Sequence, residues 1–436
     1  MKLLWLNAGL LLPLDKGGKL RTWHLMRHLA ARHDITYLSF CEPAQTAADR
    51  DGMREVCARL ETLPRTDPAK GTLWFYADAA RYLVDQVPYA VAKYRSEAYR
   101  ARVEHLLRTE AFDAVICDFL VPLVNMPGHV PCPAILFTHN VEAEIWRRHA
   151  ENATNPAAKY LLSQQWQRML AFERDALARF DLVLAVSAAD GQTFERLYPG
   201  ALRAPVHVVQ TGVDTVFFSP APPERRDRPA HLVFTGSMDW LPNEDGMQYF
   251  VRDILPIIRR SLPQATLSII GRAPTPAVRR LADEAGIEVT GRVDDVRPHI
   301  AEGTVYVVPL RIGGGTRLKI FEAMAMAKAV VSTTIGAEGL PVTDGRDIRI
   351  ADEPARFAAA VVRLVDDVAE RQRIEQAARR LVVERYDWSA VAQDFENALG
   401  RACLHSQEAG AVAATRRPAH RTSAEPREAT PVAGSI

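Results

Sequence analysis

Short apolar segments alternate with helix-like segments along most of the chain. We predict strands for residues 2–7, 34–40, 113–118, 134–139 and 181–187, and after a break for residues 231–236, 265–271, 287–291, 304–310 and 329–333. Most of these segments are apolar throughout, which is typical of parallel strands covered by helices on both faces. Their alternation with helix-like segments predicts an α/β fold built from doubly wound parallel sheets.

The segment 206–229 interrupts this alternation. It reads VHVVQTGVDTVFFSPAPPERRDRP, a short strand, a turn and a stretch rich in proline and charge, which indicates a linker. We therefore predict one domain over residues 1–205 and a second over residues 206–385. A helix is expected over 386–400, and the aperiodic residues 401–436 are predicted to form a disordered tail.

Composition and charge narrow the classes of function. The net charge of +1 provides no global electrostatic reason for a nucleic-acid partner, and we predict none. The five cysteines never form a CxxC pattern, which argues against a disulfide framework and a zinc site and fits a reducing compartment. His24 and His28 have a helical spacing that could bind a metal, but no third ligand is evident, so no metal site is predicted.

The apolar N-terminus allows two interpretations, a signal peptide or a buried first strand. Asn7 interrupts the apolar run and no small-residue cleavage site follows, so we favour the strand. No stretch approaches the roughly 20 apolar residues that span a bilayer. We expect a cytoplasmic protein.

The glycine-rich segment 309–333, PLRIGGGTRLKIFEAMAMAKAVVST, carries the clearest chemistry. Gly313, Gly314 and Gly315 follow a predicted strand and precede a helix expected to begin near Thr316. Glycines let the backbone approach a ligand closely, and the free N–H groups of a helix start bind anions. The alternative is a glycine-rich turn with no ligand.

Charged residues follow in the first turns of this predicted helix. Arg317 and Lys319 lie where the helix dipole disfavours cations by about 0.3–1 kcal/mol each, so a bound anion would explain them. Glu322 lies further along, and helix side chains tilt back toward the N-terminus. Its carboxylate is therefore expected to accept hydrogen bonds from hydroxyls beside the anion, such as those of a ribose.

This region resembles a known family. The string GGGTRLKIFEAMAMAKAVVSTTIGAEGL is similar to the donor-binding segment of retaining glycosyltransferases of family 4 (glycosyl transferases group 1), which have the GT-B fold. The resemblance also covers TGVDTVFFSP, LVFTGSMDWLPNEDG, GRVDDVRPHI and YDWSAVAQDFENAL, and so spans most of residues 205–400.

The resemblance implies an architecture and a reaction. Two Rossmann-like domains would face each other, with the acceptor on the first, the donor on the second, and the helix 386–400 crossing back to the first. The expected reaction transfers a hexose-type sugar from a nucleotide-diphosphate donor to a glycan or lipid-linked acceptor of cell-surface polysaccharide or glycolipid synthesis. The nucleotide sugar would be a co-substrate, and no cofactor or obligatory metal is expected.

The donor-binding residues follow from the same resemblance, with two departures. The family has two glutamates with seven residues between them; Glu322 matches the second, which holds the ribose, but Gly314 stands at the first. In many relatives the loop at Gly236 also carries cations, whereas here Ser237 and an acidic residue follow. We hypothesise that Arg317 and Lys319 neutralise the diphosphate instead. The remaining predicted donor contacts are Gly236, Ser237, Gly313, Gly314, Gly315, Thr316, Arg292 and Val293, the last two beside the base.

In the first domain the resemblance selects two further places. Gly17 and Gly18 follow the first strand, where backbone N–H groups of the family contact the donor phosphates. His139 follows the strand 134–139, where its ring would hydrogen-bond a sugar hydroxyl. We therefore predict His139, Arg317 and Lys319 as the catalytic residues.

Alternatives stay open at this stage. Residues 70–110 interleave aromatic and basic positions, which indicates either an ordinary amphipathic helix pair or a peripheral contact with the inner face of a membrane. A nucleotide-sugar 2-epimerase shares the fold, and a catalytically weak sugar-nucleotide-binding protein would explain Gly314. A periplasmic binding protein would need an export signal.

Overall fold

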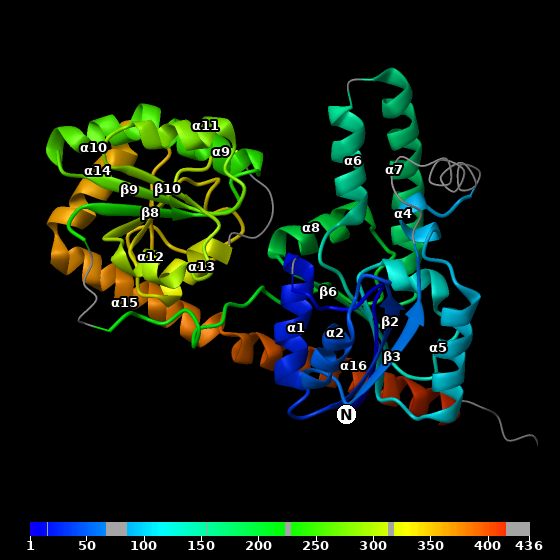
Figure 1. Ribbon diagram of the computed structural model, residues 1–436. Helices are drawn as coiled ribbons and strands as arrows, with labels where there is room; N and C mark the ends of the chain where they lie inside the picture. Colours follow the sequence, from blue (N-terminus) through cyan, green and yellow to red (C-terminus); the bar gives the residue numbers. More distant parts are fainter. Residues whose placement is uncertain (15, 67–84, 154, 223–227, 313–317, 416–436) are drawn as a thin grey trace, which may run out of the picture.

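The computed structural model describes residues 1–415 except 15, 67–84, 154, 223–227 and 313–317. Two parallel sheets form the centres of two units (Figure 1). The first, in spatial order, contains β3 (Arg59–Pro64), β2 (Asp34–Cys41), β1 (Lys2–Leu6), β4 (Ala114–Asp118), β5 (Ala134–Phe137), β6 (Leu182–Ala185) and β7 (His207–Val208). The second contains β10 (Ile287–Gly291), β9 (Thr266–Ile270), β8 (His231–Thr235), β11 (Val305–Val308), β12 (Val330–Ser332) and β13 (Arg349–Ile350).

Helices cover both sheets. Those of the N-terminal unit are α1 (Gly17–Leu29), α2 (Ala47–Gly52), α4 (Tyr89–Ala92), α5 (Glu97–Thr109), α6 (Glu142–Asn152), α7 (Pro156–Leu177) and α8 (Ala188–Leu197), with 3₁₀ turns η1 (Met53–Glu55) and η2 (Val121–Asn125). Those of the C-terminal unit are α9 (Leu241–Tyr249), α10 (Leu255–Ser261), α11 (Pro276–Arg279), α12 (Arg297–Glu302), α13 (Leu318–Ala325), α14 (Pro354–Asp366) and α15 (Val368–Arg385). A π-helical turn, η3 (Phe250–Ile254), joins α9 to α10, and a 3₁₀ turn, η4 (Arg280–Asp283), follows α11.

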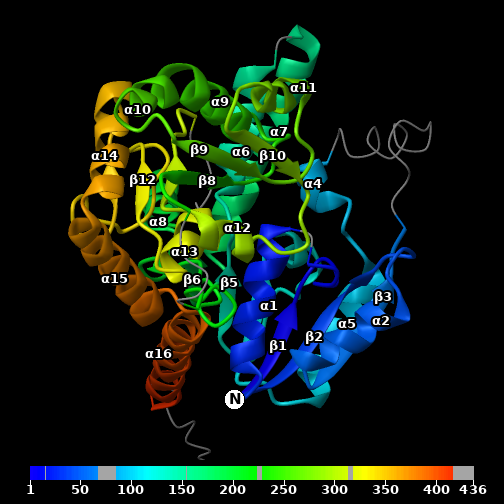
Figure 2. The same cartoon turned by 60° about the vertical axis from the view of Figure 1, so that its left-hand side comes forward.

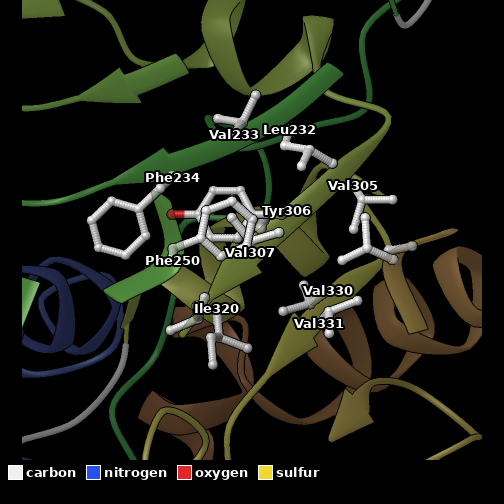
Figure 3. Packing of buried hydrophobic residues seen from close by; sticks show 14 of the residues in the cluster. Leu232, Val233, Phe234, Phe250, Val305, Tyr306, Val307, Ile320, Val330 and Val331 are labelled. Carbon is white, nitrogen blue, oxygen red and sulfur yellow. The ribbon is translucent and has the colours of Figure 1, made fainter. Parts of the chain in front are cut away.

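The packing of the cores explains why the strands are largely apolar. In the C-terminal unit, Val233 and Phe234 of β8 and Val307 of β11 are fully buried, and the helical residues Phe250 and Ile320 pack on the sheet (Figure 3). A strand buried on both faces offers no polar face to water, which is why its residues do not alternate between polar and apolar.

In both sheets the strand order reverses beside the first strand, between β1 and β4 and between β8 and β11. Ligands of doubly wound sheets bind beyond the carboxyl ends of the strands at such reversal points.

The C-terminal helix α16 (Trp388–Thr415) crosses back to the N-terminal unit, as predicted (Figure 1). Phe395 is fully buried between Trp5 of β1, with ring centroids 5.8 Å apart, and Phe137 of β5, with centroids 5.4 Å apart. The helix extends beyond the predicted range of 386–400. Residues 401–415, which were predicted to belong to a disordered tail, continue it. Their alanine, glutamate and glutamine content favours helix once packing has started one.

The predicted two-unit α/β architecture is confirmed, and every predicted strand is present. Two strands were missed: β3, whose residues are only partly buried, and β13, which has two residues, whereas β7 is the short strand predicted within the segment 206–229. β7 pairs with β6, so the N-terminal sheet continues past the predicted boundary at residue 205. Of the segment 70–110, residues 70–84 lie outside the described residues.

Two surface features bear on a membrane. Among the described residues, no helix combines the length and the apolar character that a membrane span requires. Helices α6 and α7 form a hairpin that projects from the N-terminal unit (Figures 1 and 2). Near its tip, Tyr160 is 64% and Leu161 is 48% exposed.

The crossover helix should be a stability determinant of the N-terminal unit. Phe395→Ala removes a fully buried ring between two strands, and we expect it to lower the free energy of unfolding of this unit by about 3–5 kcal/mol. Urea denaturation followed by circular dichroism measures the change. Leu404→Ala on the same helix, at a position 60% exposed, should change it by less than about 0.5 kcal/mol. Equal effects of the two substitutions would contradict the role of Phe395.

Candidate functional site

Polar side chains gather at the carboxyl ends of the central strands in both units. Helices α1 and α13, which start at these ends, lie on the sides of the two units that are turned toward each other (Figures 1 and 2). In the N-terminal unit the polar residues are centred on Asp118, and in the C-terminal unit on the loop that begins at Gly236.

Asp118, the last residue of β4, is a fully buried carboxylate with four hydrogen-bond donors. One oxygen accepts from Trp5 Nε1 at 3.0 Å, Asn7 Nδ2 at 2.7 Å and Thr22 Oγ1 at 2.8 Å. The other oxygen lies 2.7 Å from Nε2 of His139. These partners come from β1, α1 and the end of β5, so the carboxylate joins three segments at the edge of the sheet. Such complete satisfaction is what allows a carboxylate to be buried.

His139 is held on both ring nitrogens. Its Nδ1 lies 2.8 Å from a terminal nitrogen of Arg21, and because arginine has only donors, Nδ1 accepts. The ring proton is therefore assigned to Nε2, which donates to Asp118. Burial lowers the pKa of His139, as does the Arg21 charge, while Asp118 opposes the shift. The ring is thus neutral, and a hydrogen bond to a sugar hydroxyl, which stays a prediction, would have to replace one of these two contacts.

Phe119 covers the imidazole and explains one of the two N-terminal glycines. Its ring stacks on His139 with centroids 3.9 Å apart, and its backbone has a φ of 65°. A Cβ at Gly18 would lie 2.6 Å from the tip of the Phe119 ring, so this position needs glycine for packing. At Gly17 a Cβ would meet nothing within 4 Å, which leaves this backbone open to a ligand.

In the C-terminal unit, Lys319 reaches the loop after β8. Its Nζ donates to Oδ1 of Asn243 at 2.8 Å and lies 4.1 Å from the centre of the Phe234 ring. A Cβ at Gly236 would come within 2.7 Å of this Nζ and 2.6 Å of the Asn243 amide nitrogen. Glycine therefore makes room for the lysine, and the loop that lacks cations in its own sequence receives one from α13.

A second cation at this loop was missed by the sequence analysis. Arg272 follows β9 and donates from Nε to Ser237 Oγ at 2.9 Å, while Ser237 Oγ donates to Asp239 at 2.6 Å. A Cβ at Gly271 would lie 1.6 Å from the Gly236 carbonyl oxygen, so two glycines allow the ends of β8 and β9 to touch. In the sequence, the feature that could have indicated this cation is the pair Gly271–Arg272 directly after the buried strand β9.

Glu322 is a partly buried carboxylate on α13, three residues after Lys319. Burial raises its pKa to about 7, with Lys319 opposing the shift. It accepts no hydrogen bond from any residue that the structure describes. A desolvated acid without a donor costs stability, and such groups mark binding sites.

The other predicted donor residues divide into two groups. Arg292 is exposed and Val293 packs against the core directly after β10, on the same edge as Gly236. Gly313, Gly314, Gly315, Thr316 and Arg317 lie outside the described residues.

Two other observations concern the rest of the molecule. The described residues contain no group of three metal-ligating side chains. The hollows lined by Arg50 and Leu60 and by His129 and Arg179 are elsewhere on the N-terminal unit, away from the carboxyl edges.

The raised pKa of Glu322 predicts a pH-dependent cost. The folded protein binds this proton more tightly than the unfolded chain, so stability is lost as pH rises from about 4.5 through about 7. At pH 8 we expect ligand-free Glu322→Gln to be more stable than the wild type by on the order of 1–3 kcal/mol, and nearly equal at pH 5. Thermal and urea unfolding at both pH values test this, with Glu384→Gln at an exposed position of α15 as the control. A difference independent of pH would contradict the assignment.

Comparisons with known proteins agree with this arrangement. A family model described as Glycosyltransferase Family 4 matches residues 16–217, and one described as Glycosyl transferases group 1 matches residues 229–367. A glycogen synthase of Mycobacterium tuberculosis is 28% identical over 386 residues, which cover 85% of this chain and 87% of the relative. An uncharacterized 44.6 kDa protein in the cps region of Klebsiella pneumoniae is 20% identical over 86% of this chain and 94% of its own length.

Solved structures show the same architecture. Anabaena HepE in complex with UDP and glucose superposes with a TM-score of 0.60 at 16% identity, over 92% of this chain and 99% of HepE. WaaG, a glycosyltransferase involved in lipopolysaccharide biosynthesis, gives a TM-score of 0.57 at 13% identity, over 91% of this chain and 98% of WaaG. At these identities the likeness establishes the GT-B fold. Since the two family models match consecutive parts that together span most of the chain, the protein belongs to the glycosyltransferases of family 4, group 1.

Proposed function

We propose that this protein is a retaining glycosyltransferase that moves a hexose-type sugar from a nucleotide-diphosphate donor to a glycan or lipid-linked acceptor. One observation carries the proposal: Glu322, a desolvated carboxylate without a hydrogen-bond donor among the described residues, stands beside Lys319 at the carboxyl edge of the C-terminal sheet. A vicinal diol supplies the missing donors, and a diphosphate suits the cation. A nucleotide diphosphate offers both groups at a short distance from each other.

The protein would contact the donor at three parts of the molecule: its ribose, its diphosphate and its base. Glu322 accepts hydrogen bonds from the ribose hydroxyls, and Lys319 and Arg272 neutralise the diphosphate, together with Arg317 and the backbone of residues 313–316. The backbone at Gly236 and Ser237 approaches the phosphates, and Gly17 does so from the opposite unit. Arg292 and Val293 lie beside the base. HepE, whose complexes contain UDP with glucose and UDP-glucose, supports a donor of this chemistry.

The transfer requires mainly stabilisation of the leaving group. The bond between the anomeric carbon and the phosphate oxygen breaks, and the acceptor oxygen forms a bond to the same face of that carbon. The proton of the acceptor hydroxyl passes to the departing phosphate oxygen, so no protein nucleophile is needed. Lys319, Arg317 and Arg272 balance the charge that develops on the diphosphate, which is why we propose no obligatory metal. Closure of the two units would exclude water and limit hydrolysis of the donor.

We further propose a place of action at the inner face of the cytoplasmic membrane, in the assembly of cell-surface polysaccharide or glycolipid. The Klebsiella relative, a protein in a cps region, and WaaG, which is involved in lipopolysaccharide biosynthesis, support this class of acceptor. The exposed Tyr160 and Leu161 on the projecting α6–α7 hairpin offer an apolar contact for a peripheral protein.

Donor binding should depend on Glu322. In a thermal-shift panel of UDP-, GDP-, ADP- and TDP-sugars, we expect at least one to raise the melting temperature of the wild type by mass action. Glu322→Ala should abolish the shift because the ribose loses its acceptor, whereas Glu384→Ala, at an exposed position of α15, should retain it. The absence of any shift with the wild type would contradict a donor site.

Turnover of the identified donor then separates the alternatives. Transfer to an acceptor with the anomeric configuration kept supports the proposal, and inversion of that configuration contradicts retention. Epimerisation without an acceptor indicates a 2-epimerase, and binding without turnover indicates a sugar-nucleotide-binding protein.

Lys319 should contribute to binding of the phosphates but not of the nucleoside. We expect Lys319→Ala to weaken binding of the nucleoside diphosphate about ten- to a hundredfold, since a hydrogen bond to a charged group contributes about 1.5–3 kcal/mol. Binding of the corresponding nucleoside should change less than about twofold, because it has no phosphate. Isothermal titration calorimetry measures both, with Lys159→Ala on α7 as the control. Equal losses for nucleoside and diphosphate would argue against this role.

A further inference from the structure

Arg21 is a largely buried cation that the proposed chemistry does not use. It lies in the second turn of α1, and burial lowers its pKa to about 10, against the attraction of Asp118 and Asp190. No carboxylate among the described residues forms an ion pair with it. Its guanidinium instead makes two hydrogen bonds to neutral groups, to Nδ1 of His139 at 2.8 Å and from Nε to Thr211 Oγ1 at 2.9 Å.

Thr211 belongs to the connection between the two units. The chain passes from β7 to β8 here and returns before α16, and the two passages lie side by side. The Val213 amide donates to the Tyr386 carbonyl at 2.7 Å, and Thr215 Oγ1 donates to Asp387 at 2.6 Å. A Cβ at Gly212 would lie 2.6 Å from the Trp388 ring, so the two passages are in contact next to Thr211. We call these paired passages, residues 211–215 and 386–388, the hinge.

We infer that Arg21 is a positioning residue that ties the His139 imidazole to the hinge between the two units. The inference goes beyond the donor site described above, and its catalytic part rests on the proposed sugar transfer and on the predicted contact of His139 with a sugar hydroxyl. The guanidinium is planar with its N–H groups in a fixed fork, so one side chain can satisfy the imidazole and the hydroxyl together. A shift of Thr211 relative to His139 would break one of these bonds. The relative position of the units is therefore coupled to the orientation of His139.

The same contact sets the protonation of the imidazole. The charged groups that face His139 are Asp118 from β4 and Arg21 from α1, while Asp190 of α8 acts on Arg21. Asp118 raises the pKa of His139, and both burial and Arg21 lower it. Removing the cation takes away one of the two influences that lower the pKa of His139, while burial and Asp118 keep acting on the ring. We therefore expect the pKa of His139 to rise when Arg21 is replaced by a neutral residue.

Three substitutions separate the effects in the full-length protein. Arg21→Met removes both hydrogen bonds and the charge, Arg21→Lys keeps the charge without the fork, and Thr211→Val removes only the hinge bond. Arg27→Lys and Arg27→Met, on an exposed position of the same helix, are the matched controls. If Arg21→Met does not fold, Arg21→Lys and Thr211→Val still carry the test.

The first readout is the ¹⁵N spectrum of the histidine side chains, which needs no activity. We expect the wild type to show His139 neutral with its proton on Nε2. Arg21→Lys should move the Nδ1 resonance, and Arg21→Met should raise the pKa of His139. An unchanged His139 in both variants would overturn the inference, whatever reaction the protein catalyses.

The second readout is steady-state transfer with the donor identified above. His139 is the residue predicted to hydrogen-bond a sugar hydroxyl in place of one of its present partners, and displacing such a group lowers kcat more than it changes donor binding. We therefore expect Arg21→Lys and Thr211→Val to lower kcat by about tenfold or more, with donor KM changed by less than about twofold. On acidification, Arg21→Met should also lose activity at a higher pH than the wild type does, whereas the Arg27 variants keep the wild-type profile. Altered resonances with unchanged kcat would overturn the catalytic part. A wild type without transferase activity would refute the proposed function and leave the first readout intact.

Discussion

A carboxylate cut off from solvent needs hydrogen-bond donors in place of the water it has lost, and Asp118 takes them from several segments. Trp5 lies in β1, Asn7 directly after it, Thr22 in α1, and His139 just after β5. Each donor is oriented by this single group, so the relative positions of these segments follow from it. His139 then orients Arg21, and Arg21 contacts Thr211. The edge of the N-terminal sheet is thus one connected polar network within an apolar core.

The environment of Glu322 in the C-terminal unit differs from that of Asp118. Glu322 is desolvated on α13 without a donor from the described residues, which raises its pKa to about 7. Around it, glycines at positions 236 and 271 let the ends of β8 and β9 and the Lys319 side chain approach closely. A fold that stays stable can tolerate a few such unsatisfied groups, and they concentrate where a ligand completes them. The buried carboxylate Asp118 of the N-terminal unit is thus satisfied by the protein itself, whereas Glu322 of the C-terminal unit has no donor among the described residues.

The crossover helix makes the division between the units different in sequence and in space. Phe395 fills the N-terminal core between Trp5 and Phe137, although it follows the whole C-terminal unit in the chain. The hinge is consequently built from two passages of the chain, at Val213 and Tyr386. Two parallel connections restrict the units to a narrower set of movements than a single linker would allow. Because the movements are restricted in this way, the hydrogen bond between Arg21 and Thr211 depends on the relative position of the two units.

Local pattern was enough to predict the architecture. Strands buried on both faces are largely apolar, so their positions and the two units could be read from the chain, and so could the helix that carries Glu322. Lys319 was expected to compensate for the missing cations near Gly236, and its Nζ lies there. The short strand β13 was not predictable, because two residues carry no periodicity.

Which polar residues act together became visible only in the folded chain. Arg21 and Thr211 are 190 positions apart, Asp118 has its donors on separate elements, and Arg272 meets Ser237 across two strands. Gly18 serves packing against Phe119, whereas the neighbouring Gly17 stays open. The physical reason is that burial leaves a periodic trace along the chain, because each residue of a strand or helix faces a predictable side. A hydrogen bond between distant segments leaves no such trace, since its geometry exists only after the segments have packed.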